Sequence, residues 1–281
     1  MKKRVIGIGD NVCDKYYPSK IMYPGGQAMN FSVYAKKLGA DAAYMGVFGT
    51  DSVASHIIHT LEQFQIDYSR CRQYKGENGY AKVRLENGER EFIMSNKGGI
   101  VNEYPLDLNK EDLEYIRGFH LVHTSCNGHF DSQIFKVKEA GVPISYDFSG
   151  RWKQEAYIDT ISSVIDYGFF SCTDASEDEI RQLCRRVVSN GCSLAIVTRG
   201  KNGSVVYDGI QFYSHVSKPV DALDTLGAGD SFAAAFLLSL LDTEDIETSM
   251  EAGAQFAVLF KKLQLLLHVR YSAHWLCLFL K

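Results

Sequence analysis

The sequence predicts an α/β fold built on a mostly parallel sheet with helices on both faces. Short apolar runs alternate with amphipathic stretches along most of its 281 residues, a pattern typical of strand–helix–strand units. No internal repeat and no long polar linker divides the chain. A chain of this length buries roughly 75% of its unfolded surface, so it can form a sizeable core without metals or disulfides. One segment, at 80–94, breaks the alternation and predicts a small additional sheet.

The composition excludes several classes of protein. The 24 glycines and 5 prolines are too few for a disordered or collagen-like chain. A net charge of −4 gives no basic surface for nucleic acid or for an anionic membrane. The seven cysteines are odd in number and include no CxxC pair, which favours reduced thiols over disulfides or structural zinc. The apolar run before Asp10 is too short for a signal peptide, and charged and histidine residues interrupt the apolar tail. We therefore expect a soluble, cytoplasmic protein.

The first half of the chain predicts two strand–helix units followed by a hairpin. VIGIG (5–9) and AAYMGVF (42–48) are expected to be buried strands. After each strand, apolar side chains recur at helical spacing, and the first helix is expected to end at Gly39. The two sets are Ala28, Phe31, Ala35 and Leu38, then Val53, Ile57, Leu61 and Phe64. YAKVRLENGEREFIM (80–94) alternates on both sides of Asn87-Gly88, the dipeptide typical of a two-residue hairpin.

The second half resumes the alternation of strands and helices. Asn109 with Asp112, and Ser176 with Glu179, have the spacing of helix starts, and the second pair predicts a capping box. Strands are expected at 119–125, 142–148, 166–172 and 194–200, a second hairpin at 203–213, and further helices at 130–140, 227–241 and 245–262.

The segment DTLGAGDSFAAAFL (224–237) carries the strongest chemical signal. Gly227, Ala228 and Gly229 have little or no side chain and lie where a helix begins, so their free N–H groups and the helix dipole can bind an anion. Asp230 places a carboxylate at the same helix start, where it can accept a proton from a hydroxyl that attacks a phosphoryl group. The alternative is that Asp230 is only a favourable acid in the first helical turn.

Three further positions have the character of ligand contacts. Gly25 and Gly26 precede a helix whose apolar face is complete without them, although an ordinary tight loop is the alternative. Asp14 follows a buried strand, at the carboxyl end where α/β sheets bind ligands, but a surface carboxylate would look the same. Thr198 also ends a strand, and a simple strand-to-turn transition is its alternative.

The motifs DTLGAGD and GGQAMNFSVYAKKLG (25–39) resemble the two signatures of the ribokinase-like (PfkB) family of carbohydrate kinases. The resemblance extends from residue 4 to about residue 258. It implies a single kinase domain over 1–281 with a three-layer ribokinase-like fold, a mostly parallel central sheet and a small β lid. Lid strands are expected at about 15–24 and 80–98. The implied activity is ATP-dependent phosphorylation of a sugar hydroxyl.

The resemblance also implies the catalytic and sugar-binding residues. Asp230 matches the catalytic base of the family. The anion hole corresponds to Gly227, Ala228 and Gly229. The sugar contacts correspond to Asp14, Gly25, Gly26 and Asn30, with Asp10 as a second carboxylate contact.

The nucleotide and metal positions match the family less completely. Thr198, Gly200 and Gly203 fit the TxGxxG turn beside the ATP phosphates, together with Gly227 and Gly229. The NxxE segment near a magnesium-bound water corresponds to Asp174-Ala-Ser-Glu177, with Asp in place of Asn. Its carboxylates suit Mg²⁺ bound through water, but the same segment is an excellent helix start.

The C-terminal tail departs from the family. Residues 261–281 lack the small residues and glycines that close the adenine pocket and a monovalent-cation site, so neither site can be assigned. One hypothesis is a frameshifted or altered C-terminus, and the other is that the apolar tail packs over the same pocket.

The expected substrate is a sugar or a sugar–amino acid adduct, phosphorylated at a primary hydroxyl. GDNVCDKYYP (9–18), YDFSGRW (146–152) and the short chain are most similar to family members that phosphorylate fructoselysine at its 6-hydroxyl. The alternatives are a fructokinase- or ribokinase-type sugar kinase, or a sugar-binding homologue that the altered tail has impaired. ATP and Mg²⁺ are the expected cosubstrate and cofactor. A homodimer through the lid is compatible with the resemblance, and no nucleic acid or membrane partner is expected.

Overall fold

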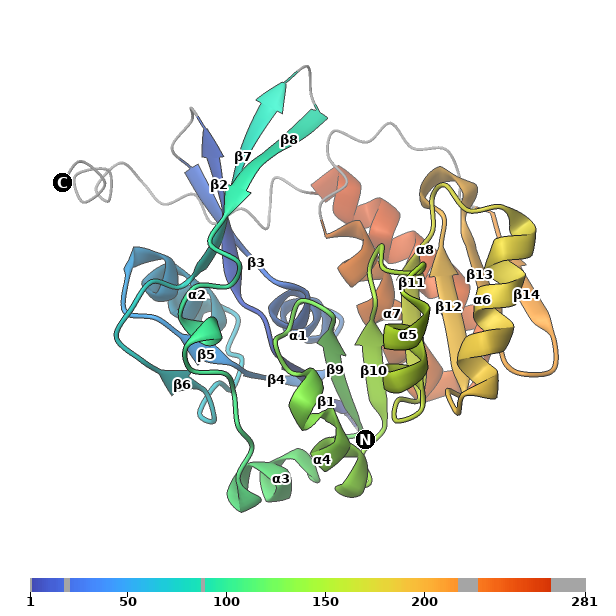
Figure 1. The fold of residues 1–281 in the computed structure, drawn as a ribbon, viewed down its shortest axis with the longest axis horizontal. Coiled ribbons are helices and arrows are strands. Elements are labelled where there is room, and N and C mark those ends of the chain that lie inside the picture. Colours follow the sequence, from blue (N-terminus) through green and yellow to red (C-terminus); the bar gives the residue numbers. More distant parts are fainter. Residues whose placement is uncertain (1, 18–20, 87–88, 217–226, 264–281) are drawn as a thin grey trace.

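A sheet of eight strands forms the centre of the part of the chain that the computed structural model describes, which is residues 2–17, 21–86, 89–216 and 227–263 (Figure 1). Six strands are parallel, in the spatial order β12 (Leu194–Thr198), β11 (Tyr167–Ser171), β10 (Ile144–Asp147), β9 (Leu121–Ser125), β1 (Arg4–Ile8) and β4 (Asp41–Met45). At one edge, β13 (Ser204–Tyr207) and β14 (Phe212–His215) continue the sheet antiparallel, which confirms the second predicted hairpin.

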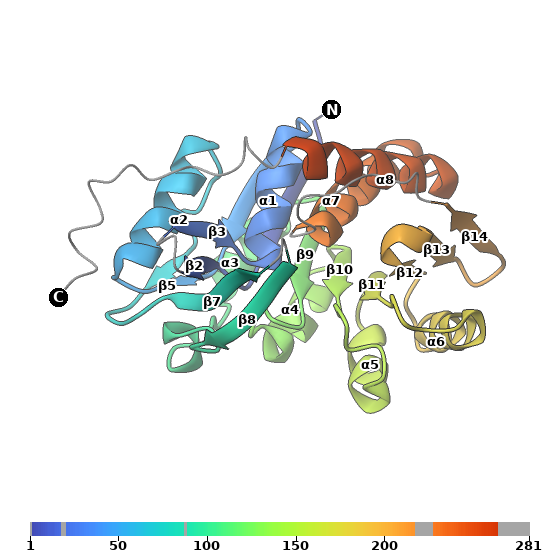
Figure 2. The ribbon, with the colours of Figure 1, turned by 90° about the horizontal axis from the view of Figure 1, so that it is seen from above.

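Helices cover both faces of the sheet, as the alternation predicts (Figure 2). One face carries α1 (Gln27–Lys37), α7 (Ala228–Thr243) and α8 (Ile246–Leu263). The other carries α3 (Lys110–Ile116), α4 (Ile134–Glu139), α5 (Glu155–Ser162) and α6 (Glu177–Ser189). The helix α2 (Ser52–Gln63) contacts the two strands nearest the N-terminus of the chain in the second sheet, which is described below. The α/β fold with a mostly parallel sheet is therefore confirmed.

Successive residues of each strand contribute to two separate cores. Val5 packs with the helices of the α1 face, whereas Ile6 packs with those of the opposite face. Leu121 and Val122 divide in the same way on β9. All four side chains are fully buried. Burial on both faces explains the continuous apolar runs of these strands, since each such side chain contributes about 1.5–3 kcal/mol.

The helix α1 packs directly against β1 at Gly7. A Cβ atom at Gly7 would lie 2.1 Å from the carbonyl oxygen of Ala28 and 2.5 Å from Oγ of Ser32. The Gly7 N–H instead donates to Ser32 Oγ at 3.1 Å. This close approach holds the N-terminus of α1 at the carboxyl end of the sheet, where α/β proteins bind ligands.

A second, four-stranded sheet projects beyond this carboxyl end (Figure 1). Its order is β3 (Ile21–Gly25), β2 (Val12–Tyr17), β7 (Gly79–Glu86) and β8 (Glu89–Ser95). The predicted pairing around Asn87-Gly88 is confirmed, because β7 and β8 are antiparallel neighbours; residues 87–88 themselves lie outside the described residues. The expected partner segment 15–24 overlaps β2, which begins earlier than predicted at Val12, and β3, which begins at Ile21. Residues 18–20 lie outside the described residues.

Two local predictions need correction, and one helix was missed. The run 42–48 is not one strand: it divides into β4 and β5 (Val47–Phe48), and β5 pairs with β6 (Arg72–Gln73) in a separate two-stranded sheet. The division falls at Gly46, where a Cβ atom would meet Tyr44 Oη at 2.0 Å. The segment 130–140 begins as a 3₁₀ turn, η2 (Asp131–Gln133), before α4, and α5 was not predicted.

Both predicted helix starts are confirmed. The side chains of Asn109 and Ser176 cap α3 and α6, and each helix has a reciprocal capping box. Two further 3₁₀ turns are η1 (Ile100–Asn102) and η3 (Gly200–Asn202). No helix among the described residues is long and apolar enough to cross a membrane. The apolar tail, from residue 264 to residue 281, lies outside the described residues.

Candidate active site

The carboxyl ends of three central strands meet the N-termini of α1 and α7. Asp10 follows β1, Ser125 ends β9 and Asp147 ends β10. The α1 helix begins beside Asp10, and α1 packs along α7. Carboxylates, hydroxyls and the positive ends of two helices therefore converge at one edge of the sheet.

A hydrogen bond between α1 and α7 joins two of the predicted site residues. Asn30 Nδ2 donates to Asp230 Oδ2 at 2.7 Å. The pKa of Asp230 is raised to about 7, chiefly by burial. The bond from Asn30 lowers this pKa, and the nearby carboxylates of Asp147, Asp10 and Asp14 raise it. A carboxyl with a pKa near neutrality can exchange a proton with a hydroxyl at physiological pH, as a general base must.

The start of α7 has the backbone geometry expected of an anion site. Gly227 is the N-cap residue and has a left-handed backbone, with φ of 71°. The first turn contains Ala228, Gly229 and Asp230, whose N–H groups have no preceding turn to bond. A Cβ atom at Gly229 would meet nothing within 4 Å, so this side of the turn is open. These residues can therefore present N–H groups to an anion next to the Asp230 carboxyl.

Asp10 has a role that the sequence did not predict. Its carboxylate accepts hydrogen bonds from the N–H groups of Gln27 at 2.8 Å and Ala28 at 3.2 Å, and from Ser125 Oγ at 3.3 Å. Asp10 thus accepts hydrogen bonds from N–H groups that the first turn of α1 would otherwise leave without a partner, although it lies 17 residues before Gln27 in the sequence. Burial raises the pKa of Asp10, and these hydrogen bonds oppose the shift.

The two glycines before α1 differ from one another. Gly26 is the N-cap residue of α1, with φ of 107°, and a Cβ atom there would lie 2.6 Å from the carbonyl oxygen of Asp10. Gly25 ends β3 opposite Val12, and a Cβ atom there would come no closer than 3.9 Å to any atom. The fold therefore requires glycine at 26, but leaves room for a methyl group at 25.

Gln27 and Asp147 belong to the site and were missed. Gln27 Nε2 donates to Asp147 Oδ2 at 2.8 Å, and the Ser149 N–H donates to Asp147 Oδ1 at 2.6 Å. Burial raises the pKa of Asp147 to about 6, with a smaller contribution from Asp10. The signal that could have identified Asp147 is a carboxylate at the end of the apolar strand in YDFSGRW (146–152).

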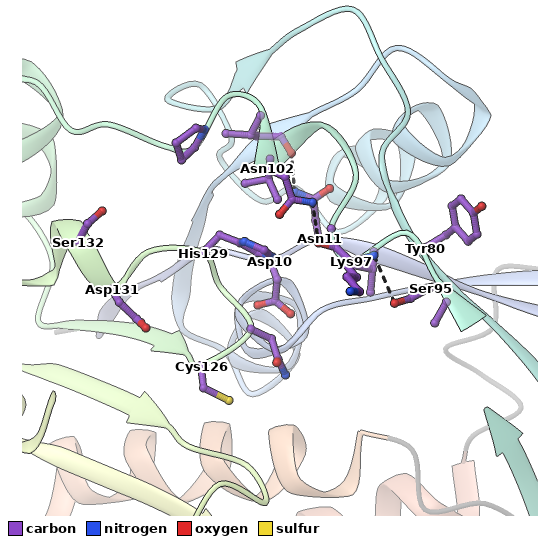
Figure 3. Close-up of a pocket in the computed structure, with 18 of the residues that line it drawn as sticks. Asp10, Asn11, Tyr80, Ser95, Lys97, Asn102, Cys126, His129, Asp131 and Ser132 are labelled. Atoms are coloured by element: carbon purple, nitrogen blue, oxygen red, sulfur yellow. Dashed lines mark hydrogen bonds between the residues drawn. The ribbon is translucent and has the colours of Figure 1, made fainter. Parts of the chain in front are cut away.

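A cavity of about 820 Å³ opens between the carboxyl end of the main sheet and the second sheet (Figure 3). Its walls come from the loops after β1 and β9, the turn after β10, and the strands β7 and β8. The polar and charged side chains among its lining residues are Asp10, Asn11, Tyr80, Ser95, Lys97, Asn102, Cys126, Asn127, His129, Asp131, Ser132 and Arg151. The cavity is large enough for a sugar that carries a substituent.

Of the predicted sugar contacts, one lines this cavity and the others do not. Asp10 lines the cavity, whereas Asp14, Gly25, Gly26 and Asn30 are not among the lining residues. Asp14 lies within β2, not in a loop, and its charge raises the pKa of Asp230.

The predicted nucleotide residues of the TxGxxG turn lie at the end of β12 and in the turn that follows it. Thr198 ends β12 and donates from Oγ1 to the Phe170 carbonyl at 3.3 Å. Gly200 and Gly203 bracket η3 with φ of 58° and 86°, which explains glycine at both positions. This turn leaves the sheet at its carboxyl end, on the same edge as the other site residues.

The predicted metal residues lie beside this turn. The Glu177 carboxylate forms an ion pair with the Arg199 guanidinium at 3.0 Å, and Asp174 is exposed between β11 and α6. Among the described residues, no three His, Cys, Asp or Glu side chains are grouped to hold a metal ion. Two carboxylates nevertheless suit Mg²⁺, which keeps several waters and binds one or two carboxylates together with substrate phosphates.

Comparison with known proteins agrees with this geometry. The chain matches the pfkB family carbohydrate kinase model over residues 14–261. It is 36% identical over 255 residues to fructosamine kinase FrlD of Bacillus subtilis, covering 90% of this chain and 89% of that protein. It is 30% identical to fructoselysine 6-kinase of Escherichia coli over 235 residues, covering 84% and 88%. Arabidopsis thaliana ribokinase, solved with ribose and ATP, superimposes with a TM-score of 0.78 at 20% identity over 93% and 92% of the two chains. The chain belongs to the pfkB family of carbohydrate kinases, which are ATP-dependent phosphotransferases.

Proposed function

We propose that this kinase transfers the γ-phosphoryl group of ATP to the 6-hydroxyl of fructoselysine or a closely related sugar–amino acid adduct. The observation that carries the proposal is the partly buried Asn30–Asp230 pair beside the open N-terminal turn of α7. The substrate class is supported by the similarity to a fructosamine kinase and to a fructoselysine 6-kinase.

In the proposed reaction, the Asp230 carboxylate accepts the proton of the attacking hydroxyl. The hydroxyl oxygen forms a bond to the γ-phosphorus as the bond from phosphorus to the bridging oxygen of ADP breaks. The N–H groups of Ala228 and Gly229 stabilise the negative charge on the phosphoryl oxygens. Asn30 holds the Asp230 carboxylate in place, because its amide donates to one of the two oxygens.

The remaining site residues are proposed to bind the substrates. Asp14, Asp10, Asn30 and the backbone at Gly25 and Gly26 would hold the sugar, and the turn from Thr198 to Gly203 would face the ATP phosphates. Asp174 and Glu177 would bind the water shell of Mg²⁺, which neutralises phosphate charge when it is bound.

The second sheet is proposed to act as a lid over the cavity. Its strands β7 and β8 supply Tyr80, Ala81, Phe92 and Ser95 to the cavity wall. Closure of such a sheet over a bound sugar would exclude water, and would thereby suppress hydrolysis of ATP.

The experiment that tests this function measures ADP release from Mg-ATP by the purified full-length chain. The acceptor panel contains fructoselysine, glucoselysine, fructose, ribose and a nucleoside, with Asp230→Asn as the inactive control. We expect strong turnover with fructoselysine. Turnover with only fructose or ribose would keep the phosphotransfer but replace the substrate. Sugar binding without ADP release from any acceptor would show that the enzyme is impaired, and would overturn the proposal.

A further inference from the structure

The outer wall of the cavity contains a guanidinium and a carboxylate that the phosphoryl-transfer reaction does not use. Arg151 follows β10, and Asp131 begins η2. Both side chains line the cavity, and neither forms an ion pair with the other or with any other residue in the described part of the chain. A cation and an anion in one wall that do not neutralise each other are suited to a ligand that carries both charges.

Arg151 is held in place by a relay of amides. Its guanidinium donates to Asn127 Oδ1 at 3.0 Å, and Asn127 Nδ2 donates to Gln27 Oε1 at 2.9 Å. Gln27 in turn donates to Asp147 at the centre of the candidate active site. The relay uses few of the five N–H donors of the guanidinium, so donors remain for a carboxylate in the cavity.

Asp131 is held by the phenol groups of two tyrosines. Its carboxylate accepts hydrogen bonds from Tyr146 Oη at 2.6 Å and from Tyr157 Oη at 2.9 Å. The Arg151 guanidinium lies 5.8 Å from the centre of the Tyr157 ring. Both charges therefore lie close to Tyr157, and the carboxylate retains lone pairs for a further donor.

The backbone around these residues is strained, which is common at ligand sites. His129 and Lys97 both lie in the cavity wall (Figure 3). Both have left-handed backbones, with φ of 51° and 53°. Ser149, two residues before Arg151, has φ of 54°. None of the three is glycine, so the surrounding structure must compensate for these unfavourable conformations.

We propose that Arg151 binds the carboxylate, and Asp131 the ammonium group, of the amino acid portion of the substrate. This inference rests on the proposed function. It assigns residues to the recognition of the amino acid portion of the substrate, for which the family signatures contain no residue. Lysine attached through its side-chain nitrogen presents a free α-ammonium and α-carboxylate to these residues. An amino acid attached through its α-nitrogen presents the same two charges closer to the sugar.

The test uses pairs of acceptors that share one sugar and differ in one charge. Nε-fructosyl-lysine is compared with fructosyl-cadaverine, and fructosyl-glycine with fructosyl-methylamine; each second member lacks the carboxylate. We expect kcat/KM to favour the carboxylate in at least one pair by roughly ten- to hundredfold, the size of a charge-assisted hydrogen bond. The pair that shows the preference identifies the nitrogen through which the amino acid is attached.

Variants then assign the two charges. Arg151→Met is expected to bring the carboxylate preference close to 1, Arg151→Lys to keep part of it, and the matched surface control Arg117→Met to keep it in full. Asp131→Asn is expected to remove the preference for Nε-fructosyl-lysine over fructosyl-6-aminocaproate, which lacks the ammonium. Each readout is a ratio measured on one protein sample, so a general loss of folded enzyme does not imitate the effect.

The outcomes separate this inference from the proposed function. Phosphorylation of every fructosyl amine with ratios near 1 would overturn the inference and leave the function standing. A carboxylate preference that survives in Arg151→Met would overturn the assignment of that residue. Phosphorylation of fructose or ribose but of no fructosyl amine would overturn the proposed function itself.

Discussion

Asn30 Nδ2 lies 2.7 Å from Asp230 Oδ2, although 200 residues separate the two in the sequence. Asn30 belongs to the first helix after the glycine pair and Asp230 to the first turn of α7, so the bond joins the two signature segments of the family. The amide lowers the pKa of a carboxyl that burial and three neighbouring carboxylates raise. A single substitution can therefore raise or lower the pKa of Asp230, depending on which of these interactions it removes.

The first prediction concerns the general base. Asp230→Asn removes the proton acceptor but retains the size and hydrogen-bonding capacity of the side chain. We expect kcat to fall by about 10²–10⁴-fold, with the fold retained. Steady-state ADP release measures kcat, and circular dichroism checks the fold. Turnover within a few-fold of wild type would exclude Asp230 as the base.

The second prediction concerns the pH dependence of activity. Since the base must be ionised and the pKa of Asp230 is raised to about 7, kcat/KM should rise with pH and level off above about 7. Asn30→Ala removes a bond that lowers this pKa, so the acidic limb should move to higher pH. Asp147→Asn removes a charge that raises it, so the limb should move to lower pH. Shifts in the same direction for both variants would contradict the electrostatic explanation.

The third prediction concerns the pH dependence of stability. The pKa of Asp230 is higher in the folded chain than its usual value of 3.8, so the folded state holds this proton more tightly. The contribution of Asp230 to the free energy of unfolding is therefore largest below about pH 4 and is lost as the pH rises to about 7. Urea unfolding of wild type and Asp230→Asn between pH 4 and 8 should show the variant gaining in relative stability as the pH rises. A constant difference across this range would mean that the pKa of Asp230 is not raised.

The fourth prediction separates the two glycines before α1. Gly26→Ala forces a methyl group to within 2.6 Å of the Asp10 carbonyl oxygen at a left-handed backbone position, so we expect a loss of about 2 kcal/mol or more in the free energy of unfolding. Gly25→Ala has room and should unfold within about 1 kcal/mol of wild type. If Gly25 lies against the bound sugar, as proposed, its variant should instead raise the KM for the sugar. Equal destabilisation of the two variants would contradict this division of roles.

The fifth prediction concerns magnesium. Glu177→Gln should raise the Mg²⁺ concentration needed for half-maximal rate by roughly tenfold, if Glu177 binds the water shell of the ion. Asp178→Asn is the matched control, because it removes a carboxylate from the same first turn of α6. An equal effect of the two substitutions would show that only the charge at the start of the helix matters.

Local features of the chain could be predicted because their causes are local. Residues a few positions apart determine the helix starts at Asn109 and Ser176, the predicted capping box at Ser176, and the paired strands on either side of Asn87-Gly88. The order of strands and helices follows from the periodicity of apolar side chains. The break of the run 42–48 at Gly46 could not be predicted, because the atoms that crowd it belong to Tyr44 and to the distant Gly9.

The sequence by itself determined the α/β class, the helix starts and the signature residues, including Asp230 and its glycine-rich turn. Only the tertiary structure decided what surrounds them: Asn30 on Asp230, Asp10 on the first turn of α1, and Asp147 among the buried carboxylates. The physical reason is that burial and the distance between charges depend on packing between segments that are distant in the sequence. Gln27, for example, lies 17 residues from Asp10 and 120 residues from Asp147. The residue types indicate which side chains can take part in catalysis. Their pKa values and contacts are determined only once the strands and helices are packed together.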